Sequence, residues 1–157
     1  MQSVKIEDTT DEGSGKNVGY IDSGDWMSYP EVTIPSTVVY TVEYQVSSNS
    51  QGGCLQLEKA GGTLVYGSLS FAATSDWQRW VTVSHTVNLE AGLQFFSIKS
   101  TGSAWNLNWF RITKFYNQES FMRTTSSIVY VHQLQYATKC IEPRQLIFSN
   151  CELFPCC

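Results

Sequence analysis

Aromatic residues beside turn residues give the first indication of chemistry in this sequence. Three of them stand near the ends of predicted strands: Tyr20 in NVGYID, Trp77 in TSDWQRW and Trp105 in GSAWNLN. Exposed aromatic side chains are costly, so a group of them indicates a binding face. Sugar rings pack flat C–H faces on aromatic planes, and their hydroxyls need amides such as that of Asn106. The pattern predicts a carbohydrate site, but it leaves open whether each aromatic residue binds a ligand or packs in the core.

Groups that could carry catalysis are few. Of the two His residues, His85 falls within an alternating strand and His132 lies in the C-terminal part. The sequence has no nucleophile elbow, HExxH motif or Gly-rich phosphate loop. A glycosidase needs two carboxylates across a cleft, but most acidic pairs here cluster in one N-terminal segment typical of a solvated loop or hard-cation site. These pairs are Glu7-Asp8, Asp11-Glu12 and Asp22 with Asp25. We predict no catalytic residue; a small glycosidase and a protein-binding adhesive module remain as alternatives.

An all-β framework is expected to position these residues. Residues 38–47 alternate apolar and polar side chains, which is the period of a half-buried antiparallel strand. Shorter strands are expected at 54–58, 63–66, 68–72, 80–86, 93–100 and 108–115, separated by turn residues. Short strands at this spacing, without a credible helix, predict a β-sandwich of two antiparallel sheets. The core is expected to include Tyr40, Tyr44, Phe95, Trp109 and Phe110.

Composition narrows the classes of partner. The chain has 157 residues, of which 13% are aromatic and only 15% charged, with a net charge of −4. The sequence has no basic cluster of the kind that binds nucleic acid. It also has no apolar run that approaches the ~20 residues of a membrane span. The opening MQSVKIEDTTDE does not resemble a secretory signal.

The character of the sequence changes between residues 116 and 117. All 11 Gly and all five Trp precede residue 110, and residues 1–116 hold eleven acids and seven bases, which accounts for the whole net charge of −4. We therefore predict a β-sandwich domain at 1–116 and a tail at 117–157 that is disordered or foreign to the domain. Four of the five cysteines lie in this tail, at spacings that match no zinc pattern, and we assign them no role: Cys140, Cys151, Cys156 and Cys157.

Four separated motifs carry a family resemblance over about residues 5–115: NVGYIDSGDWMSY, VVYTVEYQV, SDWQRWVTVSHTVNLEAG and NLNWFRI. In this order and spacing they resemble the family 6 carbohydrate-binding modules. The resemblance implies a jelly-roll-like β-sandwich that is non-catalytic and belongs to a secreted glycoside hydrolase, whose catalytic domain would be its partner in the parent chain. It also implies binding of a polysaccharide. We expect a β-glucan or an agar-type galactan, with xylan close behind.

The resemblance also implies roles for individual residues. Tyr20 and Trp77 match the pair that clamps a terminal sugar in such modules, and Asn106 matches the Asn that hydrogen-bonds it. Glu7, with Thr10 nearby, matches a segment that adds a hydrogen bond to the sugar.

A second site occurs in some members and uses a Trp and a Glu, which match Trp26 and Glu58 here. Members of the family also hold a structural Ca²⁺ with an opening strand that carries two Glu residues, and this sequence does not show that strand. Asn108, the Asn17 carbonyl and Asp22 are the candidates for part of a calcium shell. Because Ca²⁺ takes about 6–8 oxygen ligands, the sequence leaves calcium binding open.

Overall fold

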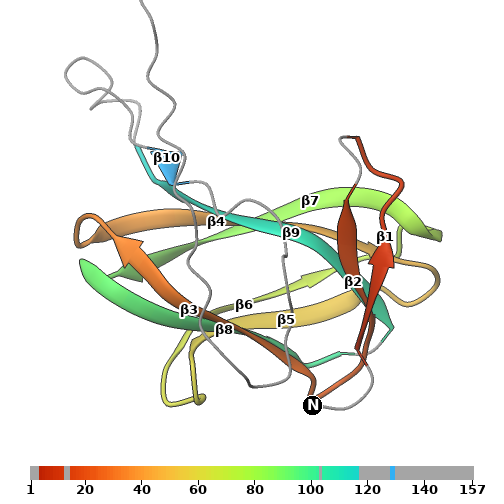
Figure 1. Ribbon diagram of the computed structural model, residues 1–157, viewed down its shortest axis with the longest axis horizontal. Coiled ribbons are helices and arrows are strands. Elements are labelled where there is room, and N and C mark those ends of the chain that lie inside the picture. Colours follow the sequence, from red (N-terminus) through yellow and green to blue (C-terminus); the bar gives the residue numbers. More distant parts are fainter. Residues whose placement is uncertain (1–3, 13–14, 103, 117–127, 130–157) are drawn as a thin grey trace, which may run out of the picture.

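Two antiparallel sheets pack face to face as a β-sandwich (Figure 1). The computed structural model describes residues 4–12, 15–102, 104–116 and the backbone of 128–129. These residues form strands, turns and loops without a helix, so the all-β prediction is confirmed. Accordingly, no helix in the described part of the chain is long and apolar enough to cross a membrane.

The larger sheet carries most of the residues singled out above. Its strands lie in the order β1 (Lys5–Asp8), β2 (Lys16–Ile21), β9 (Trp105–Lys114), β4 (Val38–Ser48) and β7 (Asp76–Leu89). The two-residue strand β10 (Ile128–Val129) pairs with β9 through its backbone; the rest of the predicted tail lies outside the described residues. β1 was not expected, because its polar sequence resembles a loop.

The smaller sheet contains β3 (Trp26–Ile34), β8 (Gly92–Ser100), β5 (Gly53–Lys59) and β6 (Val65–Phe71), in that order. The prediction of two separate strands at 63–66 and 68–72 is wrong. A single strand runs through this region and pairs with β5, with one register shift near the turn. The strand continues through Gly67, where a break was expected. A glycine can remain in a strand where a neighbouring side chain, here His85, occupies the space of its missing Cβ.

The core lies between the two sheets and follows the period of two. In β4 the inward side chains Tyr40, Val42, Tyr44 and Val46 are fully buried, which confirms the predicted strand. Burying each such side chain contributes on the order of 1.5–3 kcal/mol. Of the other predicted core residues, Trp109 is only half-buried and lies outside the core, and the prediction of Phe95 is wrong because Phe95 is 43% exposed. It lies one residue before the buried Phe96 on β8, and neighbouring residues of a strand face opposite sides.

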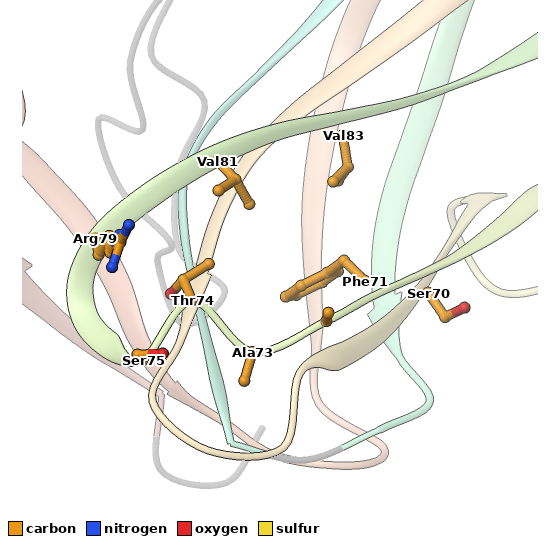
Figure 2. Close-up of a pocket in the computed structure, with 9 residues that line it drawn as sticks. Ser70, Phe71, Ala73, Thr74, Ser75, Arg79, Val81 and Val83 are labelled. Carbon is orange, nitrogen blue, oxygen red and sulfur yellow. The ribbon is translucent and has the colours of Figure 1, made fainter.

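The sandwich opens along the edge between β6 and β7. The two strands approach closely at Gly67, where a Cβ would lie 2.6 Å from His85 Nδ1. Farther along, a cleft of about 410 Å³ separates them, with Val81 and Val83 pointing toward Phe71 and Arg79 at one end (Figure 2). Because β6 and β7 belong to different sheets, no backbone ladder closes this edge.

His85 is held at the narrow end of this edge. Its Nε2 lies 3.0 Å from the hydroxyl of Tyr44. Burial raises the pKa of the Tyr44 phenol and lowers the pKa of the His85 imidazole, so both groups are neutral near pH 7. His85 therefore has the structural role expected from its place in a strand.

We expect Gly67→Ala to destabilise the domain. The added methyl group would displace the His85 ring and its hydrogen bond to Tyr44, and overpacking of this kind costs about 1–3 kcal/mol. Chemical denaturation measures the change, with Ser68→Ala, an exposed neighbour, as the control. Equal stability of the two variants would contradict the tight contact at this edge.

Candidate functional site

A bulge at the start of β7 presents Trp77. Val46 of β4 pairs with Val81, and Ser48 pairs with Asp76, so five residue steps of β7 span only two of β4. A bulge leaves residues outside the ladder and redirects their side chains, and Trp77 is 41% exposed here. Its carbonyl oxygen accepts hydrogen bonds from Ser47 Oγ at 2.6 Å and Asn106 Nδ2 at 3.0 Å. Two neighbouring strands thereby fix the backbone that carries the indole.

Gly19 makes room for two polar side chains. A Cβ at this position would lie 2.9 Å from Glu7 Cδ and 3.2 Å from Asn106 Oδ1. The Glu7 carboxylate and the Asn106 amide oxygen therefore converge over the bare backbone of Gly19. Glu7 comes from β1, whose register with β2 places it opposite Asn17, two residues before Gly19.

Glu7 and Asn106 form a polar floor over Gly19. Tyr20, the next residue in the chain, has a strained backbone conformation. Its φ is 57°, in the left-handed region that non-Gly residues rarely adopt. The register between β2 and β9 shifts between Val18 and Ile21, so Tyr20 lies at an irregularity where its side chain is 55% exposed. Strain of this kind costs on the order of 1–3 kcal/mol and is concentrated at functional sites.

Gln78 joins the N-terminal hairpin to the bulge. Its Oε1 accepts from the Thr10 backbone N–H at 3.0 Å and lies 3.4 Å from the Thr10 hydroxyl, while its Nε2 donates to Asn17 Oδ1 at 3.3 Å. Thr10 therefore lies beside the segment that carries Trp77, with its hydroxyl directed to Gln78. The sequence interpretation assigned no role to Gln78, although the DWQ motif contained it.

These contacts connect three of the five predicted first-site residues and bring them next to the backbone of a fourth, Tyr20. The Trp77 carbonyl accepts from Asn106, and the Asn106 amide oxygen and the Glu7 carboxylate both lie over Gly19. Tyr20 follows Gly19 in the chain. Two exposed aromatic side chains thus accompany a floor of one amide and one carboxylate. Such a set suits a flat molecule rich in hydroxyl groups, because it offers planar apolar faces together with donors and acceptors.

Trp105 does not belong to this surface, so for this residue the structure decides in favour of core packing, one of the two alternatives that the sequence left open. It is fully buried, its Nε1 donates to Ser100 Oγ at 2.8 Å, and its ring packs edge-on against Phe71 at 5.7 Å. Its position at the start of β9 suggested a loop, but residues from both sheets cover it.

The second predicted pair lies on the outer face of the smaller sheet. Trp26 is 44% exposed, so it is not a core residue, and it pairs with Lys99, which in turn pairs with Gln56. Glu58 is buried, and its carboxylate accepts hydrogen bonds from Gln56 Nε2 at 2.9 Å and Ser97 Oγ at 3.1 Å. The register therefore places Trp26 and Glu58 on one polar face, separated by β8.

The residues around Asn108 do not make a calcium shell by themselves. Asn108 Nδ2 donates to Asp11 Oδ2 at 2.9 Å and Gln45 Oε1 at 2.6 Å, so an amide N–H₂ group fills the space between these oxygens. Asp22 follows Ile21, which pairs with Trp105, so the register places it away from Asn108. Among the described residues, no group of three or more His, Cys, Asp or Glu side chains is arranged to hold a metal ion. Calcium binding stays a prediction.

Comparisons with known proteins identify a matching family model and a curated relative. The family model described as "Carbohydrate binding module (family 6)" matches residues 1–114. A curated relative, the clotting factor G alpha subunit of Tachypleus tridentatus, is 42% identical over 117 residues, which are 74% of this chain and 17% of that protein. The chain thus spans only 17% of the length of this curated relative.

Two solved structures illustrate the similarity in fold. A carbohydrate-binding module of Cellvibrio mixtus lichenase 5A, solved with cellotriose, is 51% identical with a TM-score of 0.71, covering 73% of this chain and 89% of that one. The C-terminal module of a laminarinase from Zobellia galactanivorans is 45% identical with a TM-score of 0.67, covering 71% and 88%.

We expect the two tryptophans to differ sharply in their contribution to stability. Trp105→Ala should lower the free energy of unfolding by about 3–5 kcal/mol, because it empties a fully buried site. Trp77→Ala should lower it by less than about 1 kcal/mol, because that side chain is partly in solvent. Thermal unfolding followed by circular dichroism gives both values. A large loss in Trp77→Ala would show that its indole supports the fold.

Proposed function

This chain belongs to family 6 of the carbohydrate-binding modules, and we propose that it binds a β-glucan between Tyr20 and Trp77. Members of this family bind carbohydrate and are non-catalytic, so the alternative of a small glycosidase is set aside. The predicted family and the prediction that the chain is not an enzyme are confirmed. The polysaccharide and the residues that hold it belong to the proposal.

The convergence over Gly19 is the observation that carries the proposal. Glu7 offers a hydrogen-bond acceptor and Asn106 an amide at one place, beside two exposed aromatic side chains. Sugar hydroxyls need such groups, and the C–H faces of the ring need the aromatic planes. The Asn106 amide donates to the Trp77 carbonyl, which leaves its Oδ1 beside Glu7. One side chain thus positions the aromatic residue and contributes to the polar floor.

Similarity to known modules favours a β-glucan over the other predicted polymers. The module of lichenase 5A was solved with cellotriose, and a Bacillus halodurans module that is 30% identical is described as binding β-1,3-glucan. The module that is 45% identical belongs to a laminarinase. A module solved with xylose is only 24% identical and supports the fold alone. We therefore place a β-glucan ahead of an agar-type galactan and xylan.

We propose further that the module directs a secreted parent protein to the polysaccharide. Similar modules in a lichenase and a laminarinase support a glycoside hydrolase catalytic domain as the attached partner. The clotting factor subunit, 42% identical over the shared region, supports a second possibility, in which the module belongs to a clotting factor instead of a hydrolase.

We expect Trp77→Ala to weaken binding of a soluble β-glucan by about tenfold or more, since a stacking aromatic contributes on the order of 1 kcal/mol beyond the area it buries. Affinity electrophoresis and calorimetry measure the loss. Phe115→Ala, which removes an exposed aromatic residue at the far end of β9, is the matched control. Unchanged retardation of the Trp77 variant on a glucan that retards the wild type would contradict the clamp.

A second site on the smaller sheet is proposed from the exposure of Trp26 beside a buried, hydrogen-bonded Glu58. A partly exposed Trp on a polar sheet face offers a stacking plane for an internal segment of a polysaccharide. The two sites use the outer faces of different sheets, so their contributions are expected to add.

We expect Trp26→Ala to weaken binding of long glucan chains by about three- to tenfold, and to weaken the residual binding of Trp77→Ala by a similar factor. Depletion assays with a high-molecular-mass β-glucan test this. If Trp26→Ala binds long chains as the wild type does, in both backgrounds, the second site is wrong.

A further inference from the structure

Lys5 projects onto the same face as the predicted first site. It lies two residues before Glu7 in β1, and alternate residues of a strand share a face. In the register of β1 and β2, Lys5 is directly opposite Gly19, the residue over which Glu7 and Asn106 converge. The missing side chain of Gly19 therefore leaves space beside Lys5 as well as beside Glu7.

The Lys5 ammonium rests on the ring of Tyr20. Its Nζ lies 4.4 Å from the ring centroid, a cation–π contact. Salt bridges in the described part of the chain join Lys16 to Asp8 and Arg111 to Glu43, and neither involves Lys5. An ammonium group carries three N–H donors, while a cation–π contact at an exposed site is weak. Lys5 is thus a donor that an incoming acceptor can draw away from the ring.

We propose that Lys5 is a further ligand-binding residue, which pairs with Glu7 to recognise hydroxyl groups of an uncharged sugar. This inference rests on the proposed function and deepens it. When a sugar stacks on Tyr20, the ammonium moves to the rim of the ring and donates to a sugar oxygen, while Glu7 accepts from another hydroxyl. The same β1 face thereby supplies one donor and one acceptor.

The opposite charges of Lys5 and Glu7 set the class of sugar. A hydroxyl can donate or accept, so neighbouring hydroxyls of a neutral sugar satisfy both side chains. A uronate placed there would attract Lys5 but bring a second carboxylate toward Glu7, and like charges at close range repel. The site therefore selects neutral glycans over glycans that carry carboxylates.

The test compares Lys5→Met with the wild type in calorimetry, using laminarihexaose and cellohexaose as probes. We expect about a three- to tenfold loss of affinity in Lys5→Met and a smaller loss in Lys5→Arg, which keeps donors at this position. Lys16→Met is the matched control, because it makes the same charge change on the same hairpin but pairs with Asp8 on the other face. It should bind as the wild type does.

The charge preference is tested with an oligoglucuronate of matched length. The wild type should bind it at least tenfold more weakly than the better neutral probe. The affinity for that neutral probe should change less than about twofold between low and high salt.

Tighter binding of the oligoglucuronate than of the neutral probe would overturn the proposal. Unchanged or tighter binding of the neutral probes by Lys5→Met would also overturn it. If the wild type binds neither neutral probe, the proposed function itself fails; if it binds and Lys5→Met matches it, only the role of Lys5 fails.

Discussion

The carbonyl oxygen of Trp77 is the point on which the predicted first site depends. It accepts hydrogen bonds from Ser47 on β4 and Asn106 on β9, and so ties the bulge of β7 to its neighbour β4 and to β9, the next strand along the sheet. A bulge without such partners would leave polar backbone groups unsatisfied, at a cost of about 1–3 kcal/mol for each buried group. The hydrogen bonds thus permit a break in the ladder that turns a large aromatic side chain toward solvent. The same Asn106 then presents its amide oxygen over Gly19, so formation of the bulge and of the polar floor are coupled.

The residues of the proposed first site are held in place by the fold itself. Tyr20 is held with φ at 57° at the irregularity between β2 and β9, and Gln78 fixes the hairpin loop against the bulge. Positions held by backbone pairing and buried hydrogen bonds lose little freedom on binding, which favours affinity. Lys5 is the exception, because a long exposed side chain on a weak cation–π contact can rearrange. The proposed site thus combines a fixed clamp with one adjustable donor, which would accommodate sugars that differ in hydroxyl geometry.

Both predicted surfaces use the outer faces of the sandwich, and alternation along the strands explains why. Val18 and Leu107 fill the core, while their neighbours Gly19 and Asn106 belong to the opposite face of the larger sheet, where Asn106 is buried beside Glu7. In the smaller sheet, buried Met27 follows the exposed Trp26. Because neighbouring side chains of a strand alternate, each outward residue can vary in chemistry without disturbing the core.

The sequence by itself determined the architecture and supplied most residues of the proposed site. The alternation of residues 38–47 and the turn residues around Gly61 express local preferences, which need no knowledge of distant contacts. The family resemblance also implied roles for Tyr20, Trp77, Asn106 and Glu7. Contacts in the structure bring Trp77, Asn106 and Glu7 together around Gly19, which precedes Tyr20 in the chain. Only the tertiary structure decided which aromatic side chains are exposed: Trp77 and Trp105 have similar neighbours in sequence, but a bulge lifts one and both sheets cover the other. The tertiary structure also formed β1 from a polar segment and placed Lys5 opposite Gly19. Burial and register at strand ends depend on what packs across from them, and that information is absent from any local stretch of sequence.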